Sequence, residues 1–197
     1  MPAIGVMLVG VVVLYSLKVG YMTRQPTVEL IACIDVEPAW MSWTCKEVLF
    51  HHAMSQSDLN KLNSHAGMLY AVSISKKSEA EAILAFLGSA GVDINAKDVS
   101  ARGRTALHST VAAGDAWATT LLLEHGAKID VADDGGVTPL GLAQALVSQH
   151  PDRPEYRAVL DALNRAVKLR SLGRTDIAAA RGYTRALSAL QTARHTS

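Results

Sequence analysis

The first part of the chain is a long apolar stretch. Residues 3–17 carry no charged side chain, and only Lys18 interrupts the apolar character through residue 22. A helix needs about 20 apolar residues to cross a bilayer. Residues 3–22 supply that length if Lys18 extends its ammonium group to the lipid headgroups. The pattern therefore predicts a single, uncleaved N-terminal membrane anchor within residues 1–24.

Two other interpretations of this stretch stay open. A cleaved signal peptide needs a basic start and small residues at the cleavage site, but KVGYMTRQP (18–26) offers no A-x-A pattern. The other interpretation is a buried core helix. Lys18 and Arg24 follow the apolar run, which by the positive-inside rule favours a cytoplasmic body. A short anchor before a body of this size is also the usual layout of bacterial periplasmic proteins. We expect a single-pass inner-membrane protein with a periplasmic body and leave the cytoplasm open.

The next segment, residues 25–56, has the least regular pattern and is expected to cap the fold at its N-terminal end. TVELIACIDV (27–36) is β-branched and apolar, which favours a strand. The residues that follow predict a helix from about Thr44. Trp40 and Trp43 are expected to pack on the first repeat, and the alternative is a position at the bilayer surface.

An internal repeat occupies the middle of the chain. GRTALHSTVAAGDAWATTLLLEHGAKIDVA (103–132) is followed by GVTPLGLAQAL (136–146), and Thr105 and Thr138 stand 33 residues apart. ILAFLGSAGVDINAKD (83–98) matches the end of the first stretch. A period of this length is typical of helix pairs whose apolar faces are buried only when neighbouring pairs stack.

These residues resemble the ankyrin repeat in their Gly-x-Thr-Pro-Leu-His start, their Gly-Asp between two helices and their LLLEHGA ending. The resemblance covers about residues 57–166. It implies an all-α ankyrin repeat solenoid of about three helix pairs, preceded by the single transmembrane helix. In that family the Thr and His at the positions of Thr105 and His108 hydrogen-bond to each other, so His108 is expected to be structural. The leucines expected in the stacked core are Leu107, Leu121, Leu122, Leu140, Leu142 and Leu160.

The C-terminal part departs from the repeat. SQHPDRPE (148–155) is longer than the usual turn, and its prolines cannot continue a helix. The helical pattern resumes over residues 155–169. Residues 167–197 are expected to form a basic C-terminal helix, in which TDIAAARGYTRALSALQTA (175–193) starts with helix-capping residues.

Composition and charge narrow the class of protein. With 197 residues, 49% hydrophobic and 19% charged, the chain has enough apolar surface to fold, which excludes a disordered tail protein. The net charge of +1 gives no indication of nucleic-acid binding. The charge is unevenly spread, at +2 in residues 1–24, −7 in residues 25–164 and +6 in residues 165–197. Such a split is typical of chains that meet a partner or a membrane with one end, although a solvated basic helix explains it equally well.

No catalytic motif is present, so an enzyme is not expected, nor is a cofactor or a metal. Cys33 and Cys45 lack the close spacing of zinc ligands. They are expected to form a disulfide if the body faces the periplasm and to stay as two thiols if it faces the cytoplasm. Asp133 and Asp134 are interpreted as an exposed acidic turn rather than as metal ligands.

The expected function follows from the resemblance. Ankyrin arrays bind proteins through the tips of their hairpins and the concave face of their first helices. We expect a membrane-tethered protein-binding module, in particular a bacterial immunity protein or inhibitor that masks a cognate toxin. The alternative is an adaptor or assembly factor of a cell-envelope complex. The resemblance places the partner-binding positions at Ala101, Arg102, Arg104, Ala112 and Ala113 in one unit and at Asp134, Gly135, Val137, Ala145 and Leu146 in the next.

Overall fold

The computed structural model describes residue 13, residues 16–51 and residues 54–171. Helices hold most of these residues, so the prediction of a mainly helical body is confirmed. The labelled elements are α2 (Thr27–Val36), α3 (Ala39–His51), α4 (Gln56–Ser64), α5 (Met68–Val72), α6 (Lys77–Ser89), β1 (Lys97–Asp98), β2 (Arg104–Thr105), α7 (Ala106–Ala113), α8 (Ala116–Glu124) and α9 (Pro139–Gln149). Residues 16–22 and 154–171 are also helical.

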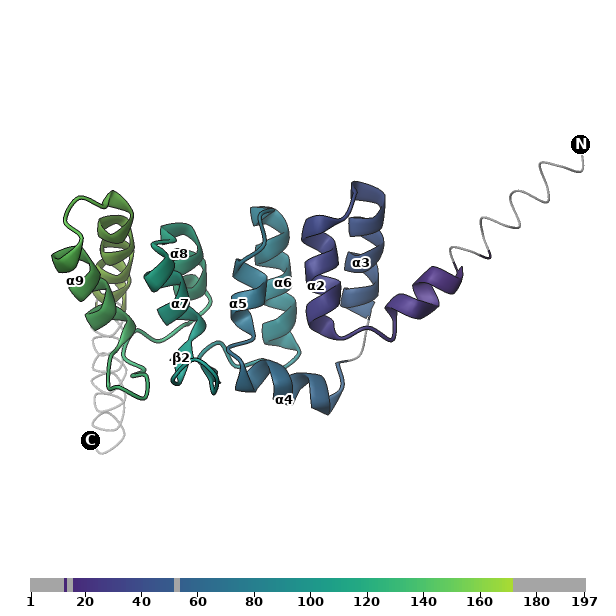
Figure 1. Ribbon diagram of the computed structural model, residues 1–197, viewed down its shortest axis with the longest axis horizontal. Coiled ribbons are helices and arrows are strands. Elements are labelled where there is room, and N and C mark those ends of the chain that lie inside the picture. The colour runs from purple at the N-terminus through teal and green to yellow at the C-terminus, as the bar shows by residue number, and fades with distance from the viewer. Residues whose placement is uncertain (1–12, 14–15, 52–53, 172–197) are drawn as a thin grey trace, which may run out of the picture.

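The helices stand in a row of pairs (Figure 1). Helix α2 packs on α3, α5 on α6, and α7 on α8, while α9 and the helix over residues 154–171 stand together at the far end of the row. The first helix of each pair contacts the first helix of the next, from α2 through α5 and α7 to α9. The three pairs expected over residues 57–166 are present. Within the described residues, α2 and α3 add a pair on the N-terminal side of them.

Local sequence signals set the ends of the repeat helices. Thr138 precedes α9, and its hydroxyl accepts the backbone N–H of Gly141 at 3.1 Å. Pro139 is the first residue of that helix, where a missing N–H costs no hydrogen bond. Asp115 caps α8 in the same way by accepting the N–H of Ala118 at 2.9 Å. Gly114 ends α7 in the left-handed conformation with φ of 72°, which a residue without Cβ adopts without strain.

The core runs along the whole row of pairs. Leu107, Leu121 and Leu122 are buried as expected. Leu140, Leu142 and Leu160 are only partly buried and pack against the core from its edge. The largest fully buried side chains are Leu30, Ile34, Leu49, Ile83, Leu84, Leu87, Leu107, Leu122, Leu163, His108, Val111 and Val159. Since these residues come from every pair, the pairs share one core instead of each folding around its own.

The prediction of a single transmembrane helix is wrong. No helix among residue 13, residues 16–51 and residues 54–171 is both long enough and apolar enough to span a bilayer. The helical residues 16–22 end at a turn, and Met22 is buried in the protein core. Lys18 places its ammonium 5.8 Å from the centre of the Trp40 ring, so this segment packs on the protein. Residues 3–12 and 14–15 of the expected span lie outside the described residues.

The expected strand over residues 27–36 is also wrong, because these residues form α2. Leu30, Ile31 and Ile34 are buried on one face, at the spacing of a helix and not of a strand. β-Branched residues favour strands only weakly, and packing against α3 overrides that preference. Helix α3 begins at Ala39 instead of Thr44.

Other expectations for the two ends have mixed outcomes. Trp40 and Trp43 are 62% and 58% exposed, so they do not pack on the first repeat as expected.

At the C-terminal end, α9 stops at Gln149 and helix resumes at residue 154, which confirms the break expected over residues 148–155. The segment 172–197, with most of the expected basic helix, lies outside the described residues.

The N-terminal pair packs on its neighbour through polar and aromatic contacts. The Lys46 ammonium on α3 lies 2.7 Å from a carboxylate oxygen of Glu79 on α6. The rings of Phe50 and Phe86 on the same two helices are 5.2 Å apart between centroids, a favourable distance for a tilted aromatic pair. The segment expected only to cap the array thus forms a helix pair of its own.

Candidate functional site

Six of the ten expected partner-binding positions lie on two loops that we call the first finger (residues 97–105) and the second finger (residues 133–138), and the other four lie on α7 and α9. In the first finger, β1 and β2 pair antiparallel. The Asp98 carboxylate accepts the hydroxyl of Ser100 at 2.6 Å and its backbone N–H at 2.8 Å. These hydrogen bonds, led by the Ser100 hydroxyl, lower the pKa of Asp98 below its ordinary value. The loop is therefore shaped by its own side chains, which leaves its tip free to project.

The second finger is built around Asp133. One carboxylate oxygen of this residue accepts the backbone N–H groups of Gly135 and Val137, each at 2.9 Å. Hydrogen bonds to the charged carboxylate, first from Val137 and then from Gly135, lower the pKa of Asp133. Asp133 is buried, so the expectation of an exposed acidic turn is wrong for this residue and correct for its exposed neighbour Asp134. Among the described residues, no group of three or more His, Cys, Asp or Glu side chains is placed to hold a metal ion.

The two fingers touch each other. The backbone N–H of Asp134 donates to the carbonyl of Arg102 at 3.0 Å. Gly103 has a φ of 66°, and a Cβ atom at this position would collide with the Asp134 carboxylate. The positive φ favours glycine at position 103. The contact holds the exposed side chains of both fingers on one edge of the protein.

His108 connects α7 to the second finger. Its Nδ1 accepts the backbone N–H of Thr105 at 3.1 Å and lies 3.0 Å from the Thr105 hydroxyl. Its Nε2 lies 2.9 Å from the carbonyl of Val137, which can only accept, so Nε2 carries the proton. The side chain is 0% exposed. A neutral imidazole satisfies all these partners, which is a structural role and agrees with the expectation from the sequence.

The pKa of His108 is lowered from its ordinary value near 6.5, chiefly because burial disfavours the charged imidazolium. Above about pH 6.5 the imidazole is neutral in both the folded and the unfolded chain. Below that pH the unfolded chain binds the proton first, so the free energy of unfolding falls as the pH falls toward the lowered pKa. We expect the melting temperature to decrease between pH 7 and pH 5, and His108→Gln to flatten this decrease.

The matched control for that measurement is His125→Gln, since His125 is exposed. This variant should keep the slope of the unmodified protein. The carboxylates of Asp98 and Asp133 do not interfere, because their lowered pKa values place their own loss of stability below about pH 5. Equal slopes for His108→Gln and the unmodified protein would contradict the assignment.

The ten expected contact positions differ in their solvent exposure. Arg102, Ala113, Asp134, Gly135, Val137 and Ala145 are exposed, and Ala101, Arg104, Ala112 and Leu146 are half-buried. Arg104 Nε lies 3.6 Å from a carboxylate oxygen of the buried Asp133. Arg104 therefore lies beside a buried carboxylate, and among the ten expected positions the exposed charges without an ion pair in the described residues are those of Arg102 and Asp134.

Sequence reasoning missed the residues that join the N-terminal pair to the array. Lys76 donates from its ammonium to the carbonyl of Ile34 at 2.8 Å. The Asp35 carboxylate accepts the backbone N–H of Ser75 at 3.0 Å. These partners lie about 40 residues apart in the sequence, and no periodic pattern relates them. One signal was available, namely Pro38, which removes the N–H that would normally bond to the Ile34 carbonyl.

A scan of the chain against protein-family models finds no match, and a search of the curated proteins finds none either.

Proposed function

We propose that this chain is a repeat protein of the ankyrin type that binds another protein across its two fingers and the adjoining first helices. The observation that carries the proposal is the pair of touching fingers. Their buried polar groups, Asp133 and His108, serve the loops themselves. Arg102 and Asp134 are exposed and form no ion pair with any residue that the structure describes. Exposed side chains on a rigid, internally hydrogen-bonded edge are typical of a binding surface.

The repeat geometry supports the ankyrin type. Gly103 and Gly136 are 33 residues apart and have similar positive φ angles of 66° and 77°. Asn95 Oδ1 accepts the backbone N–H of Lys128, also 33 residues away, at 2.8 Å. Asn63 Oδ1 accepts the N–H of Asp93 at 2.7 Å in the preceding unit. Equivalent contacts thus recur between successive units, as a linear array of similar repeats requires.

The particular function that we favour is masking of a toxin by an immunity protein or inhibitor. Residues 25–164 carry a net charge of −7, which would attract a basic face of an effector and steer its approach. This choice rests on analogy with small ankyrin proteins. An adaptor of a cell-envelope complex would use the same surface, so the identity of the captured partner distinguishes the two.

Exchanging the charges of Arg102 and Asp134 tests the proposed surface. We expect the double variant Arg102→Glu with Asp134→Lys to weaken partner binding by at least about tenfold, which corresponds to about 1.4 kcal/mol. Net charge is unchanged, so a loss reports the position of the charges. The partner is first captured from the native host with the unmodified protein, and its dissociation constant is then measured for each variant.

The matched control exchanges an exposed opposite-charge pair on the helix over residues 154–171, with Asp161→Lys and Arg165→Glu. This variant should bind like the unmodified protein and melt at the same temperature. Arg104 is left unchanged because a glutamate there would face the buried Asp133. Full binding by the finger variant, at an unchanged melting temperature, would move the binding site away from the fingers. Capture of an envelope component instead of a toxin would favour the adaptor.

A further inference from the structure

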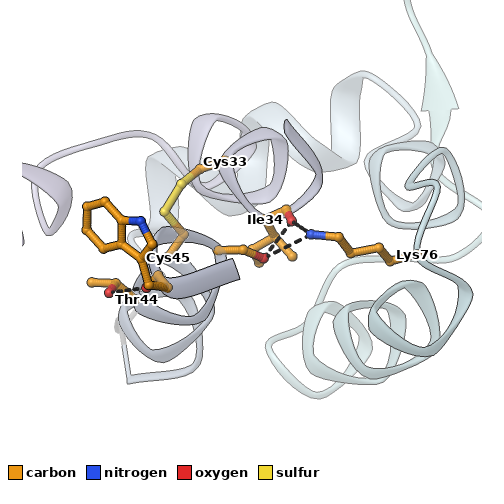
Figure 2. Close-up of a disulfide and its surroundings, with 7 residues drawn as sticks. Cys33, Ile34, Thr44, Cys45 and Lys76 are labelled. Carbon is orange, nitrogen blue, oxygen red and sulfur yellow. Dashed lines mark hydrogen bonds between the residues drawn. A yellow bond between two sulfur atoms is a disulfide. The ribbon is translucent and has the colours of Figure 1, made fainter. Parts of the chain in front are cut away.

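The disulfide between Cys33 and Cys45 joins α2 to α3, with 6.1 Å between the two Cα atoms (Figure 2). Cys45 is fully buried, whereas Cys33 is half-buried. Both cysteines line a cavity of about 270 Å³, together with the charged residues Lys18, Glu29 and Glu37. A small thiol can therefore approach this disulfide from the cavity, on the side of Cys33.

The two residues after Cys33 hold the N-terminal pair on the array. The carbonyl of Ile34 has no N–H partner one turn later, because that position is Pro38. It accepts instead the hydroxyl of Ser42 at 2.7 Å and the ammonium of Lys76 at 2.8 Å. Figure 2 shows the Lys76 side chain reaching from the neighbouring unit to this point. A cation is favoured here, since the carbonyl end of a helix carries partial negative charge.

Asp35 makes the second link. Its two carboxylate oxygens accept the backbone N–H and the hydroxyl of Ser75, at 3.0 and 3.2 Å. Three consecutive residues thus carry the cross-link to α3 and two of the polar links to the next unit. The last turn of α2 is thus held by side-chain partners of the Ile34 carbonyl and the Asp35 carboxylate, and the disulfide ties the same turn to α3.

The geometry points to Cys33 Sγ as a site of thiol–disulfide exchange, through which a dithiol reductant loosens the N-terminal pair from the rest of the array. A thiolate of the reductant attacks Cys33 Sγ, and the bond to Cys45 breaks with its electron pair on the Cys45 sulfur, which takes up a proton. The second thiol of the reductant, as thiolate, then attacks the reductant sulfur of the mixed disulfide. Cys33 leaves as a thiolate and is protonated. The protein disulfide is reduced to two thiols, and the dithiol is oxidised to a disulfide.

Attack is assigned to Cys33 because a thiolate must reach the sulfur in line with the bond that breaks. Cys33 is the less buried of the two cysteines that line the cavity, which favours attack on its sulfur. Reduction then frees the last turn of α2, which holds the acceptors for Lys76 and Ser75. The remaining contacts between α3 and α6, such as the Phe50–Phe86 pair, keep the segment attached but less tightly held.

Hydrogen–deuterium exchange on the full chain tests this inference. We compare the oxidised protein with protein reduced by dithiothreitol and blocked with iodoacetamide. We expect amide exchange to be at least about tenfold faster in the last turn of α2, in α3 and at Ser75 after reduction. Exchange in α7, α8 and α9 should change by less than about twofold, because these helices lie further along the row, beyond α5 and α6. Unchanged exchange around α2 and α3 would overturn the proposal, as would an equal increase in every helix.

Two variants make the test specific. Cys33→Ser with Cys45→Ser should exchange like the reduced protein and should not respond to dithiothreitol. Lys76→Met keeps the disulfide but removes one link, so it should raise exchange near the last turn of α2 in the oxidised protein. A response of the double serine variant to dithiothreitol would contradict the proposal.

The site of attack is tested separately. The oxidised protein is treated with excess glutathione, quenched with acid and digested, and the mixed disulfide is located by mass spectrometry. We expect glutathione on Cys33, and glutathione predominantly on Cys45 would overturn the assignment. None of these measurements needs a binding partner, so they succeed or fail independently of the proposed function.

Discussion

Replacing Leu122 by alanine is expected to lower the free energy of unfolding by about 2–5 kcal/mol. Leu122 lies on α8 and is 0% exposed within the core that the helix pairs share. The substitution removes buried apolar surface and leaves a cavity that neighbouring pairs fill only in part. A typical domain is stable by about 5–15 kcal/mol, so this loss is a large share of the total. Urea denaturation followed by circular dichroism measures it as a lower midpoint.

The same substitution at Leu169 is the matched control. Leu169 lies on the helix over residues 154–171 and is 68% exposed, so Leu169→Ala should change the free energy of unfolding by less than about 0.5 kcal/mol. If the two alanine variants unfold at the same urea concentration, the continuous core described above is incorrect.

The second large effect is expected for His108→Ala. Removal of the imidazole leaves the buried N–H of Thr105 without its acceptor, which costs about 1–3 kcal/mol. A cavity cost adds to this figure, because the side chain is completely buried. The variant also loses the hydrogen bond from Nε2 to the Val137 carbonyl. We therefore expect lower stability together with faster amide exchange in the second finger.

His125→Ala serves as the control, since His125 is exposed at the end of α8. It should leave both the urea midpoint and the exchange of the second finger nearly unchanged. If His108→Ala lowered stability while the second finger kept its slow exchange, His108 would be a packing residue only, and its link to the finger would be refuted.

The repeat helices could be predicted because their signals are local. Thr105 and Thr138 stand one residue before a helix, and Gly114 follows one, so the chemistry that starts or stops each helix lies within a few residues of it. The positions of the finger tips came from the resemblance to the ankyrin repeat, and Arg102 and Asp134 are exposed as the resemblance implies. The helix ends required only neighbouring residues.

The failed predictions involve contacts that no local pattern encodes. Residues 27–36 have a strand-like composition, but they become a helix because Leu30, Ile31 and Ile34 are buried together. The sequence predicts an exposed carboxylate at Asp133. In the structure this carboxylate instead accepts the N–H groups of Gly135 and Val137, and the loop folds around it. The sequence predicts that Arg104 is available to a partner, but in the structure its guanidinium lies beside the Asp133 carboxylate. In each case a partner brought close by folding decides the outcome.

The sequence alone determined the helical class of the body, the period of its repeats and the positions of the helix caps, because backbone preferences and capping hydrogen bonds act over a few residues. The tertiary structure alone decided that α2 and α3 form a further helix pair and that Lys76 and Asp35 join this pair to the array. It also decided which finger charges stay free. These outcomes depend on which groups meet across some 40 residues of chain. These tertiary contacts follow from the burial of a shared apolar core and from the need to give each buried polar group a hydrogen-bond partner.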